Sequence, residues 1–222
     1  MTLSRRLAAE ALASFFLFAT VIGSGVMAEA LAGGNVALAL LGNTLATGAM
    51  LFVLIVVFGP VSGAQMNPAV TLVMALRGEM AWREGGLYVL AQLAGGILGA
   101  FAVHLMFDLP ILQYSAKARS GIGQWTGEAV ATFGLILTIL GTLRYRPGWI
   151  AATVGLYISA AYWFTSSTSF ANPSITVVRS LSNSFAGIAP ADVPSFIAAQ
   201  IAGALLGAAV AKVLFVAEPD EG

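Results

Sequence analysis

Only a few side chains in this sequence are of the types that catalysis or metal binding requires. The chain has no Cys and a single His, His104, which argues against a thiolate or imidazole metal site and against a Cys- or His-dependent catalytic centre. No nucleophile is paired with a base in a motif that would place the two together. We therefore predict that the chain is not an enzyme and uses no metal and no cofactor.

Two Asn-Pro pairs are the polar motifs that recur in matching surroundings. They lie in the segments Ser62–Leu76 (SGAQMNPAVTLVMAL) and Thr168–Leu181 (TSFANPSITVVRSL). Asn is a good N-cap and Pro is accepted in the first helical turn, so a short apolar helix is predicted after each pair. About ten residues are too few to cross a membrane, so both helices are expected to be re-entrant half-helices. The motif residues are Asn67, Pro68 and Ala69 in the first segment and Asn172, Pro173 and Ser174 in the second.

These motifs could form hydrogen bonds with neutral molecules in a narrow passage. Non-helical backbone at membrane depth is tolerated only inside protein or beside a watery cavity. Two half-helices that meet at their N-termini bring their positive dipole ends together, while the preceding loops offer carbonyl acceptors. The amides of Asn67 and Asn172 would add donors. Such a site suits a single file of neutral polar molecules and repels cations.

The elements that position these motifs must be membrane spans. Of the 222 residues, 59% are hydrophobic and only 9% are charged, whereas about 25% of the residues of a soluble domain are charged. The mean hydropathy is +0.90. Ten basic residues balance ten acidic ones. This composition excludes an ordinary soluble enzyme, a disordered chain and a nucleic-acid binder, and it makes the lipid bilayer the main partner.

Six segments are long and apolar enough to be spans of about 20 residues. With the N-terminus inside the cell, seven Lys or Arg residues fall on the cytoplasmic side and three outside, so we expect both termini to be cytoplasmic. The acidic tail Glu218–Glu221 is expected to be solvated. The predicted spans are Leu7–Leu31, Val36–Phe58, Gly85–Phe107, Gly123–Leu143, Trp149–Phe164 and Pro194–Val216. The cytoplasmic cations are Arg5, Arg6, Arg77, Arg83, Arg144, Arg146 and Lys212, and the outer ones are Lys117, Arg119 and Arg179.

The sequence contains an internal repeat. YVLAQLAGGILGAFAVHLMF, which begins at Tyr88, aligns without a gap with FIAAQIAGALLGAAVAKVLF, which begins at Phe196, and Gln92 pairs with Gln200. AEALASFFLF and GEAVATFGLI likewise pair Glu10 with Glu128. We divide the chain into repeats at 1–113 and 114–222, which together form one channel domain. Each repeat holds three spans, an odd number, so the two must have opposite orientations in the membrane, as in an inverted-topology repeat.

QMNPAVT and FANPSIT resemble the paired Asn-Pro-Ala motifs of the aquaporin and aquaglyceroporin family, the major intrinsic proteins. The resemblance covers the whole chain, although the second motif ends in Ser174 instead of Ala. It implies an all-α membrane protein with six transmembrane helices and two half-helices. It further implies a homotetramer with one pore per subunit, in a cell membrane that we take to be a bacterial inner membrane.

The selectivity filter departs from the pattern of that family. The family places an Arg three residues after the second Asn, where this chain has Ile175, and the other filter positions fall by family spacing on Thr47, Ala160 and Ser169. An insertion before Phe170 would shift the position assigned to Ala160. These four small or uncharged residues predict a wide, uncharged filter that passes solutes larger than water. It is similar to a bacterial branch linked to arsenic resistance, so neutral arsenicals such as arsenous acid join glycerol-like polyols as expected solutes.

Several polar residues outside the motifs have expected roles. Arg179 lies one helical turn beyond Ile175 and would rim an outer vestibule; the alternative is an interfacial Arg that pairs with Asp192. Glu10 and Glu128 would accept hydrogen bonds from backbone N–H groups of the broken loops. Gln92 and Gln200 would do the same for loop carbonyls.

We expect a passive channel for water and small neutral solutes, but other classes remain open from sequence. The filter could instead belong to a strict water channel. An ion- or proton-coupled carrier would need Glu10 and Glu128 on the transport path. A formate- or nitrite-type anion channel has a similar number of spans but lacks the paired Asn-Pro motifs, and an intramembrane enzyme has no supporting residues.

Overall fold

The computed structural model describes residues 1–215, and all regular structure in that range is helical. The predicted tail Glu218–Glu221 lies outside the described residues. The elements are α1 (Leu3–Leu31), α2 (Val36–Ser62), α3 (Pro68–Leu76), α4 (Trp82–Met106), α5 (Ile122–Tyr145), η1 (Pro147–Trp149), α6 (Ile150–Phe164), α7 (Pro173–Arg179), η2 (Pro190–Asp192) and α8 (Val193–Leu214).

The long helices match the predicted spans, with ends that differ by a few residues. α1, α2, α4, α5 and the segment Pro190–Leu214 are each long and apolar enough to cross a membrane. The span predicted at Trp149–Phe164 is α6, which has 15 residues, fewer than the usual span of about 20. η1 leads directly into it, so the helical segment begins at Pro147. The predicted all-helical membrane fold is confirmed.

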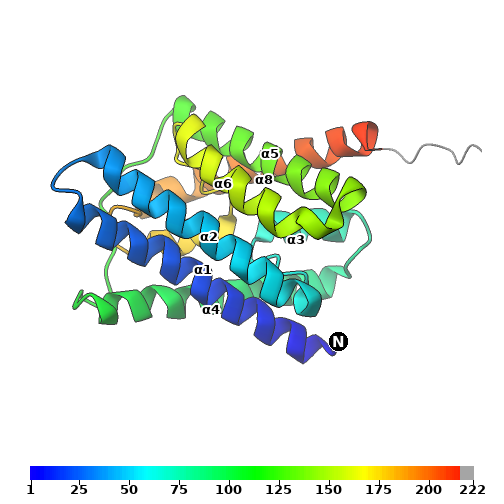
Figure 1. Ribbon diagram of the computed structural model, residues 1–222, viewed down its shortest axis with the longest axis horizontal. Helices are drawn as coiled ribbons and strands as arrows, with labels where there is room; N and C mark the ends of the chain where they lie inside the picture. Colours follow the sequence, from blue (N-terminus) through cyan, green and yellow to red (C-terminus); the bar gives the residue numbers. More distant parts are fainter. Residues whose placement is uncertain (216–222) are drawn as a thin grey trace, which may run out of the picture.

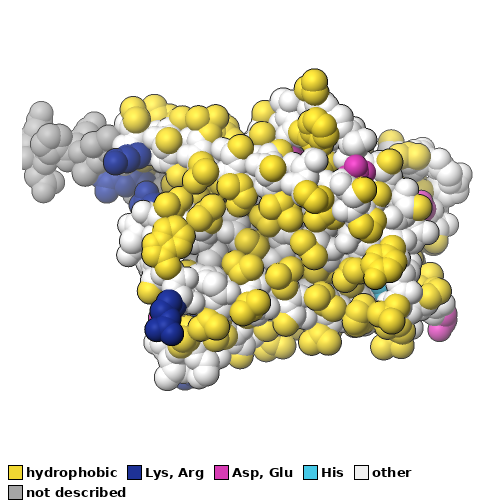
Figure 2. All heavy atoms as spheres, turned by 180° about the vertical axis from the view of Figure 1, so that it is seen from behind, with side chains coloured by type: hydrophobic (Ala, Val, Ile, Leu, Met, Phe, Trp, Pro, Cys, Tyr) yellow, Lys and Arg dark blue, Asp and Glu magenta, His cyan; other side chains and the backbone are white. Residues whose placement is uncertain are grey.

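The outer surface of the bundle is apolar. Figure 2 shows one face covered by hydrophobic side chains, with Lys and Arg gathered at one end. Large side chains such as Leu90, Leu98 and Leu206 are 58–64% exposed on the long helices, whereas Glu10 and Glu128 are fully buried. A surface with this distribution is suited to lipid. The N-terminus and the end of α8 lie at the same end of the bundle (Figure 1).

Glycines allow the closest helix pairs to form. α1 packs along α4, and α5 packs along α8. A Cβ added at Gly95 would collide with the carbonyl oxygen of Ala11, and one at Gly203 would collide with that of Ala129. The same small-residue device therefore brings the backbones together in both halves of the chain.

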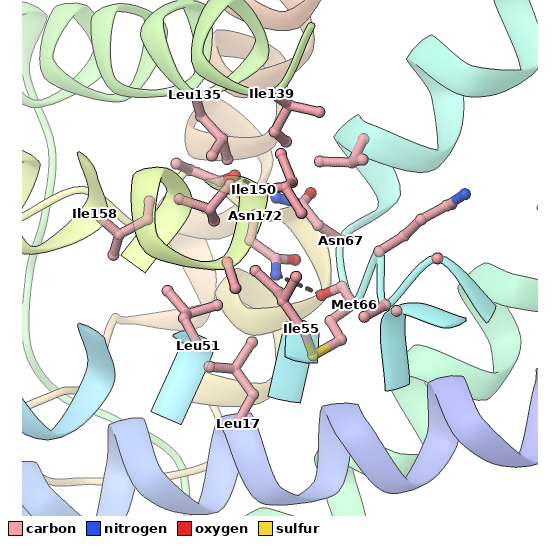
Figure 3. A pocket seen from close by; sticks show the side chains of 18 of the residues that line it. Leu17, Leu51, Ile55, Met66, Asn67, Leu135, Ile139, Ile150, Ile158 and Asn172 are labelled. Atoms are coloured by element: carbon pink, nitrogen blue, oxygen red, sulfur yellow. Dashed lines mark hydrogen bonds between the residues drawn. The ribbon is translucent and has the colours of Figure 1, made fainter. Parts of the chain in front are cut away.

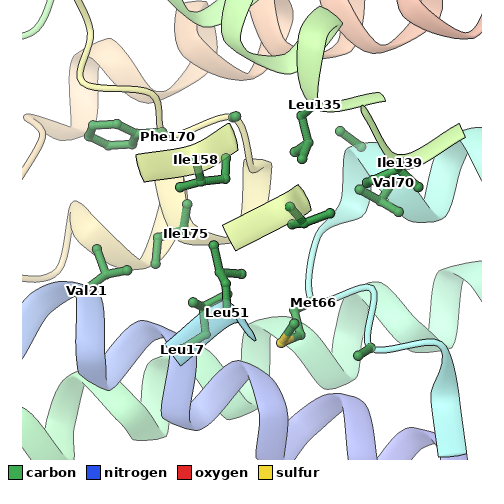
Figure 4. Packing of buried hydrophobic residues seen from close by; sticks show 14 of the residues in the cluster. Leu17, Val21, Leu51, Met66, Val70, Leu135, Ile139, Ile158, Phe170 and Ile175 are labelled. Atoms are coloured by element: carbon green, nitrogen blue, oxygen red, sulfur yellow. The ribbon is translucent and has the colours of Figure 1, made fainter. Parts of the chain in front are cut away.

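The two half-helices lie between the long helices and contact each other. Each begins at the Pro of an Asn-Pro pair and has an Asn N-cap, as predicted. Val70 of α3 and Ile175 of α7 join Leu17, Leu51 and Leu135 in one buried hydrophobic cluster (Figure 4). The long helices thus hold both Asn-Pro motifs inside the bundle.

Candidate functional site

A cavity of about 600 Å³ lies inside the bundle and is lined by residues of α1, α2, α3, α5, α6 and α7 (Figure 3). On α1 its lining runs from Arg6 to Val21, which is about 22 Å at ~1.5 Å per residue. Most of the wall is apolar, and its polar side chains include Asn67 and Asn172 of the two motifs and the charged groups of Arg6, Glu79 and Arg179. The apolar wall includes Leu17, Leu51, Ile55, Leu135, Ile139 and Ile158.

Asn67 and Asn172 hold the two motifs together in the cavity wall. The Oδ1 of Asn67 caps α3 by accepting from the N–H of Ala69 at 2.9 Å, and the Oδ1 of Asn172 caps α7 by accepting from the N–H of Ser174 at 3.0 Å. The Nδ2 of Asn67 donates to the carbonyl of Ala171, and that of Asn172 donates to the carbonyl of Met66, both at 2.7 Å (Figure 3). Both asparagines line the cavity and are about 95% buried.

The loops that precede the motifs share an unusual backbone conformation. In each loop φ is positive at the fourth, third and first positions before the Asn of the motif. A non-glycine residue pays about 1 kcal/mol for the left-handed region, so these loops need support from other groups. The residues are Gly63 (87°), Ala64 (46°) and Met66 (49°) in one loop and Thr168 (61°), Ser169 (50°) and Ala171 (47°) in the other.

Glu10 supports the first loop. Its carboxylate accepts hydrogen bonds from the N–H groups of Gln65 and Met66 at 2.9 and 2.8 Å, and from the hydroxyl of Ser62 at 2.8 Å. The amide of Gln92 donates to the same carboxylate at 2.9 Å. Because these donors come from α2, α4 and the loop before α3, the carboxylate ties that loop to the surrounding helices.

Glu128 has the equivalent arrangement in the second loop. It accepts from the N–H groups of Phe170 and Ala171 at 2.8 and 2.9 Å, and from the amide of Gln200 at 2.6 Å. Gln92 and Gln200 were expected to bond to loop carbonyls, but their Nε2 groups donate to the two carboxylates and to Thr hydroxyls instead. The reason is that a buried carboxylate is a stronger acceptor than a carbonyl.

Three of the four residues assigned to the filter line the cavity. Thr47 of α2, Ser169 of the second loop and Ile175 of α7 are each at least 95% buried and contribute to its wall. Ile175 has no charge, so the wall at this position is apolar.

The assignment of Ala160 is wrong. Ala160 is exposed on the outer face of α6, whereas Ile158 and Tyr162 face the cavity. With 3.6 residues per turn, residues 158 and 162 share a helix face, and residue 160 points to the opposite side. Tyr162 is 4% exposed, and its hydroxyl donates to that of Thr47 at 3.4 Å.

Arg179 lies at the end of α7, lines the cavity and is only 2% exposed. Its Nε donates to the carbonyl of Ala186, and its guanidinium carbon is 3.3 Å from the centre of the Phe170 ring. The alternative pairing with Asp192 is not found, because the carboxylate of Asp192 accepts from the N–H of Arg119 at 2.7 Å. Arg179 is therefore a buried cation in the cavity wall.

Arg119 is a second buried cation that the sequence analysis placed only on the outer side. It is 8% exposed and donates to the carbonyls of Gly187 and Ser167 at 2.8 and 3.1 Å. Its guanidinium carbon is 4.9 Å from the centre of the Phe170 ring. Phe170 thus receives two guanidinium groups, one from the loop before α5 and one from α7. No sequence pattern marks this contact, since Arg119 lies in an irregular loop.

This arrangement of paired Asn-capped half-helices around a cavity agrees with the comparisons with known proteins. Residues 1–161 match the model of the major intrinsic protein family. The chain belongs to this family. Within the major intrinsic proteins, it is 52% identical over 210 residues to aquaglyceroporin AqpS of Rhizobium meliloti (strain 1021), across 95% of this chain and 90% of that protein.

A second curated protein and a solved structure are also similar to this chain. Aquaporin NIP6-1 of Arabidopsis thaliana is 27% identical over 229 residues, across 100% of this chain and 72% of that protein. The X-ray structure of the aquaglyceroporin from Plasmodium falciparum superposes with a TM-score of 0.71 at 20% identity, across 95% of both chains. The predicted family and fold are confirmed, and this major intrinsic protein is a membrane channel and not an enzyme.

Proposed function

We propose that the chain is a passive channel for water and small uncharged solutes of the size of glycerol, with an outer constriction that is wide and has no charge at position 175. The observation that carries this proposal is that Thr47, Ser169 and Ile175, three of the residues that line the cavity, are small or apolar and carry no charge. Pore diameter and the groups that line it set selectivity in such channels. The 52% identical relative is named an aquaglyceroporin, which supports the same solute class.

Neutral arsenicals such as arsenous acid are part of the proposal as solutes. A molecule of this kind carries several hydroxyl groups on a compact centre, so it resembles a small polyol in its hydrogen bonding. The apolar wall that includes Leu51 and Leu135, together with the polar groups of the two motifs, supports passage of a compact solute of this kind.

A proton-coupled carrier is not supported by the geometry of the buried acids. Such a carrier needs carboxylates that exchange protons along the path. Glu10 and Glu128 instead accept hydrogen bonds from fixed backbone N–H groups, which would lose their partners on protonation.

We further propose two inverted repeats, 1–113 and 114–222, in a homotetramer with cytoplasmic termini in a bacterial inner membrane. The matched roles of Glu10 and Glu128 support the repeat. The gathering of Lys and Arg at one end of the visible face supports the orientation (Figure 2).

The test is stopped-flow light scattering on proteoliposomes that contain the full chain. A glycerol gradient, and then an arsenous acid gradient, is imposed beside an impermeant osmolyte. Fast shrinkage followed by fast re-swelling supports a solute channel. Fast shrinkage without re-swelling would mean a strict water channel and would overturn the proposed filter.

A further inference from the structure

The terminal amines of Arg179 are available to a molecule in the cavity. The side chain is 2% exposed and lines the cavity, and its Nε is committed to the carbonyl of Ala186. Within residues 1–215, neither terminal amine has a hydrogen-bond partner or a carboxylate within 4 Å. A buried guanidinium whose fork has no protein partner retains most of its capacity to bind.

The positive charge at this end of the cavity is not neutralised by contact with a carboxylate. Arg119 shares the Phe170 ring with Arg179 and donates only to neutral carbonyls. The oxygens of Glu128 and Asp192 accept from backbone N–H groups of the surrounding loops. Two buried guanidinium groups without an ion-pair partner in the described chain favour an anion that supplies the missing contact.

We propose that this end of the cavity is a binding site for small oxyanions, formed by the terminal amines of Arg179 and positioned by Arg119 through Phe170. The site lies on the solute path of the proposed channel, so a bound oxyanion should slow glycerol permeation. This consequence rests on the proposed function.

The chemical class follows from the geometry of the guanidinium fork. Two parallel N–H groups match two oxygens on one centre, as in carboxylates, sulfonates and phosphates, and charge-assisted bonds of this kind are stronger than neutral ones. The guanidinium carbon of Arg179 lies over the Phe170 ring, 3.3 Å from its centre, and this contact restricts the side chain, so little motion is lost when an oxyanion binds. The ammonium of Lys117, at 4.5 Å from the Phe185 ring, adds a third positive charge in the same loop region.

The test uses methanesulfonate, which remains anionic and does not cross lipid as a neutral acid. Glycerol re-swelling of phosphatidylcholine proteoliposomes is measured while sodium methanesulfonate replaces sodium chloride at constant ionic strength. Dimethyl sulfone is the neutral probe of similar shape. We expect saturable slowing by methanesulfonate in the wild type and none by dimethyl sulfone.

Variants locate the effect, and each is compared with its own rate in chloride. In Arg179→Met the concentration for half-inhibition should rise by about tenfold or more, the scale for one charge-assisted hydrogen bond. Arg179→Lys keeps the charge but lacks the guanidinium fork, so its half-inhibition concentration should lie between those of the wild type and Arg179→Met. Arg83→Met removes an exposed arginine from the first turn of α4 and should be inhibited like the wild type. Equal inhibition of Arg179→Met and wild type would overturn the site.

A second measurement separates this proposal from the proposed function. Thermal unfolding of the detergent-solubilised wild type and Arg179→Lys is followed in methanesulfonate and in chloride, since a ligand that binds only the folded state raises the Tm. A larger Tm shift in the wild type supports the site even if the protein does not pass glycerol. No shift together with no inhibition in a glycerol-permeable channel would refute the site alone.

Discussion

The hydroxyl of Tyr162 donates a 3.4 Å hydrogen bond to that of Thr47, and this contact joins α6 to α2 at the wall of the cavity. Both side chains are more than 95% buried and both line the cavity. The phenol ring therefore fills part of the cavity wall that a small residue in α6 would leave open, and we expect Tyr162 to help set the pore width.

Shortening Tyr162 should widen the passage. We expect Tyr162→Ala to raise the permeability to erythritol several-fold, because the ring no longer fills the wall. Tyr162→Phe keeps the ring and is the matched control, with a smaller change. Re-swelling rates in erythritol and glycerol gradients provide the measurement. An erythritol rate that stays at the wild-type level in Tyr162→Ala would contradict this role.

Adding a guanidinium at position 175 should narrow the filter. Ile175→Arg places a long cationic side chain in the cavity wall that Thr47 also lines, so glycerol permeability should fall by about tenfold while water permeability falls less. Ile175→Leu keeps the volume and the lack of charge and should behave like the wild type. Parallel glycerol and water rates in proteoliposomes distinguish narrowing from misfolding. If Ile175→Arg leaves glycerol flux unchanged, the filter assignment is wrong.

Neutralising Glu10 should destabilise the first loop. Its carboxylate accepts hydrogen bonds from Ser62, Gln65, Met66 and Gln92, and an amide would place an N–H against some of these donors. We expect Glu10→Gln to cost about 3 kcal/mol in the free energy of unfolding. Thermal unfolding in detergent measures the change.

The matched control for that change is Glu84→Gln. Glu84 pairs with Arg6 at 3.0 Å in a partly exposed salt bridge, and its loss should cost less than about 1 kcal/mol. Similar losses in the two variants would argue against a special role for Glu10.

Gly95 should tolerate no side chain. In Gly95→Ala the new Cβ meets the backbone carbonyl of Ala11 on α1, which cannot rotate away, so we expect a loss of about 2 kcal/mol or more. Gly86 lies on the same helix with open space at its Cβ position, so Gly86→Ala should be close to neutral. Yield and Tm of the purified variants test this, and equal values for both would show that α1 and α4 can separate without cost.

Oxyanion inhibition should depend on pH through Lys117. Burial, followed by the repulsion of Arg119 and Arg179, lowers the pKa of Lys117 to about 8, while Glu29 opposes the shift. The ammonium is therefore charged below this pH and neutral above it. Inhibition by methanesulfonate should weaken between about pH 7 and about pH 9, because the ammonium of Lys117 loses its charge over this range. The oxyanion itself does not titrate there, so the change reports on the protein. Lys117→Gln should remove this part of the pH dependence; an unaltered profile would exclude Lys117.

Much of this architecture could be predicted from the sequence because membrane spans and Asn-Pro turns are local signals. The half-helices after Asn67 and Asn172 follow from cap and Pro chemistry within a few residues. The error at Ala160 arose because spacing was counted across an irregular loop, and a shift of two residues turns the assigned side chain to the opposite helix face. The contact of Arg119 with Phe170 joins distant segments through an irregular loop, so no periodicity could indicate it.

The crossed bonds of Asn67 and Asn172 have a consequence for biogenesis. Within residues 1–215, the Nδ2 of each amide donates to a carbonyl from the other half of the chain, at Ala171 for Asn67 and at Met66 for Asn172. During synthesis the Nδ2 of Asn67 therefore lacks this partner until the second half of the chain has been inserted. The pore centre is therefore the last part of the molecule to mature, and a truncated product would present an unfinished polar loop to quality-control proteases.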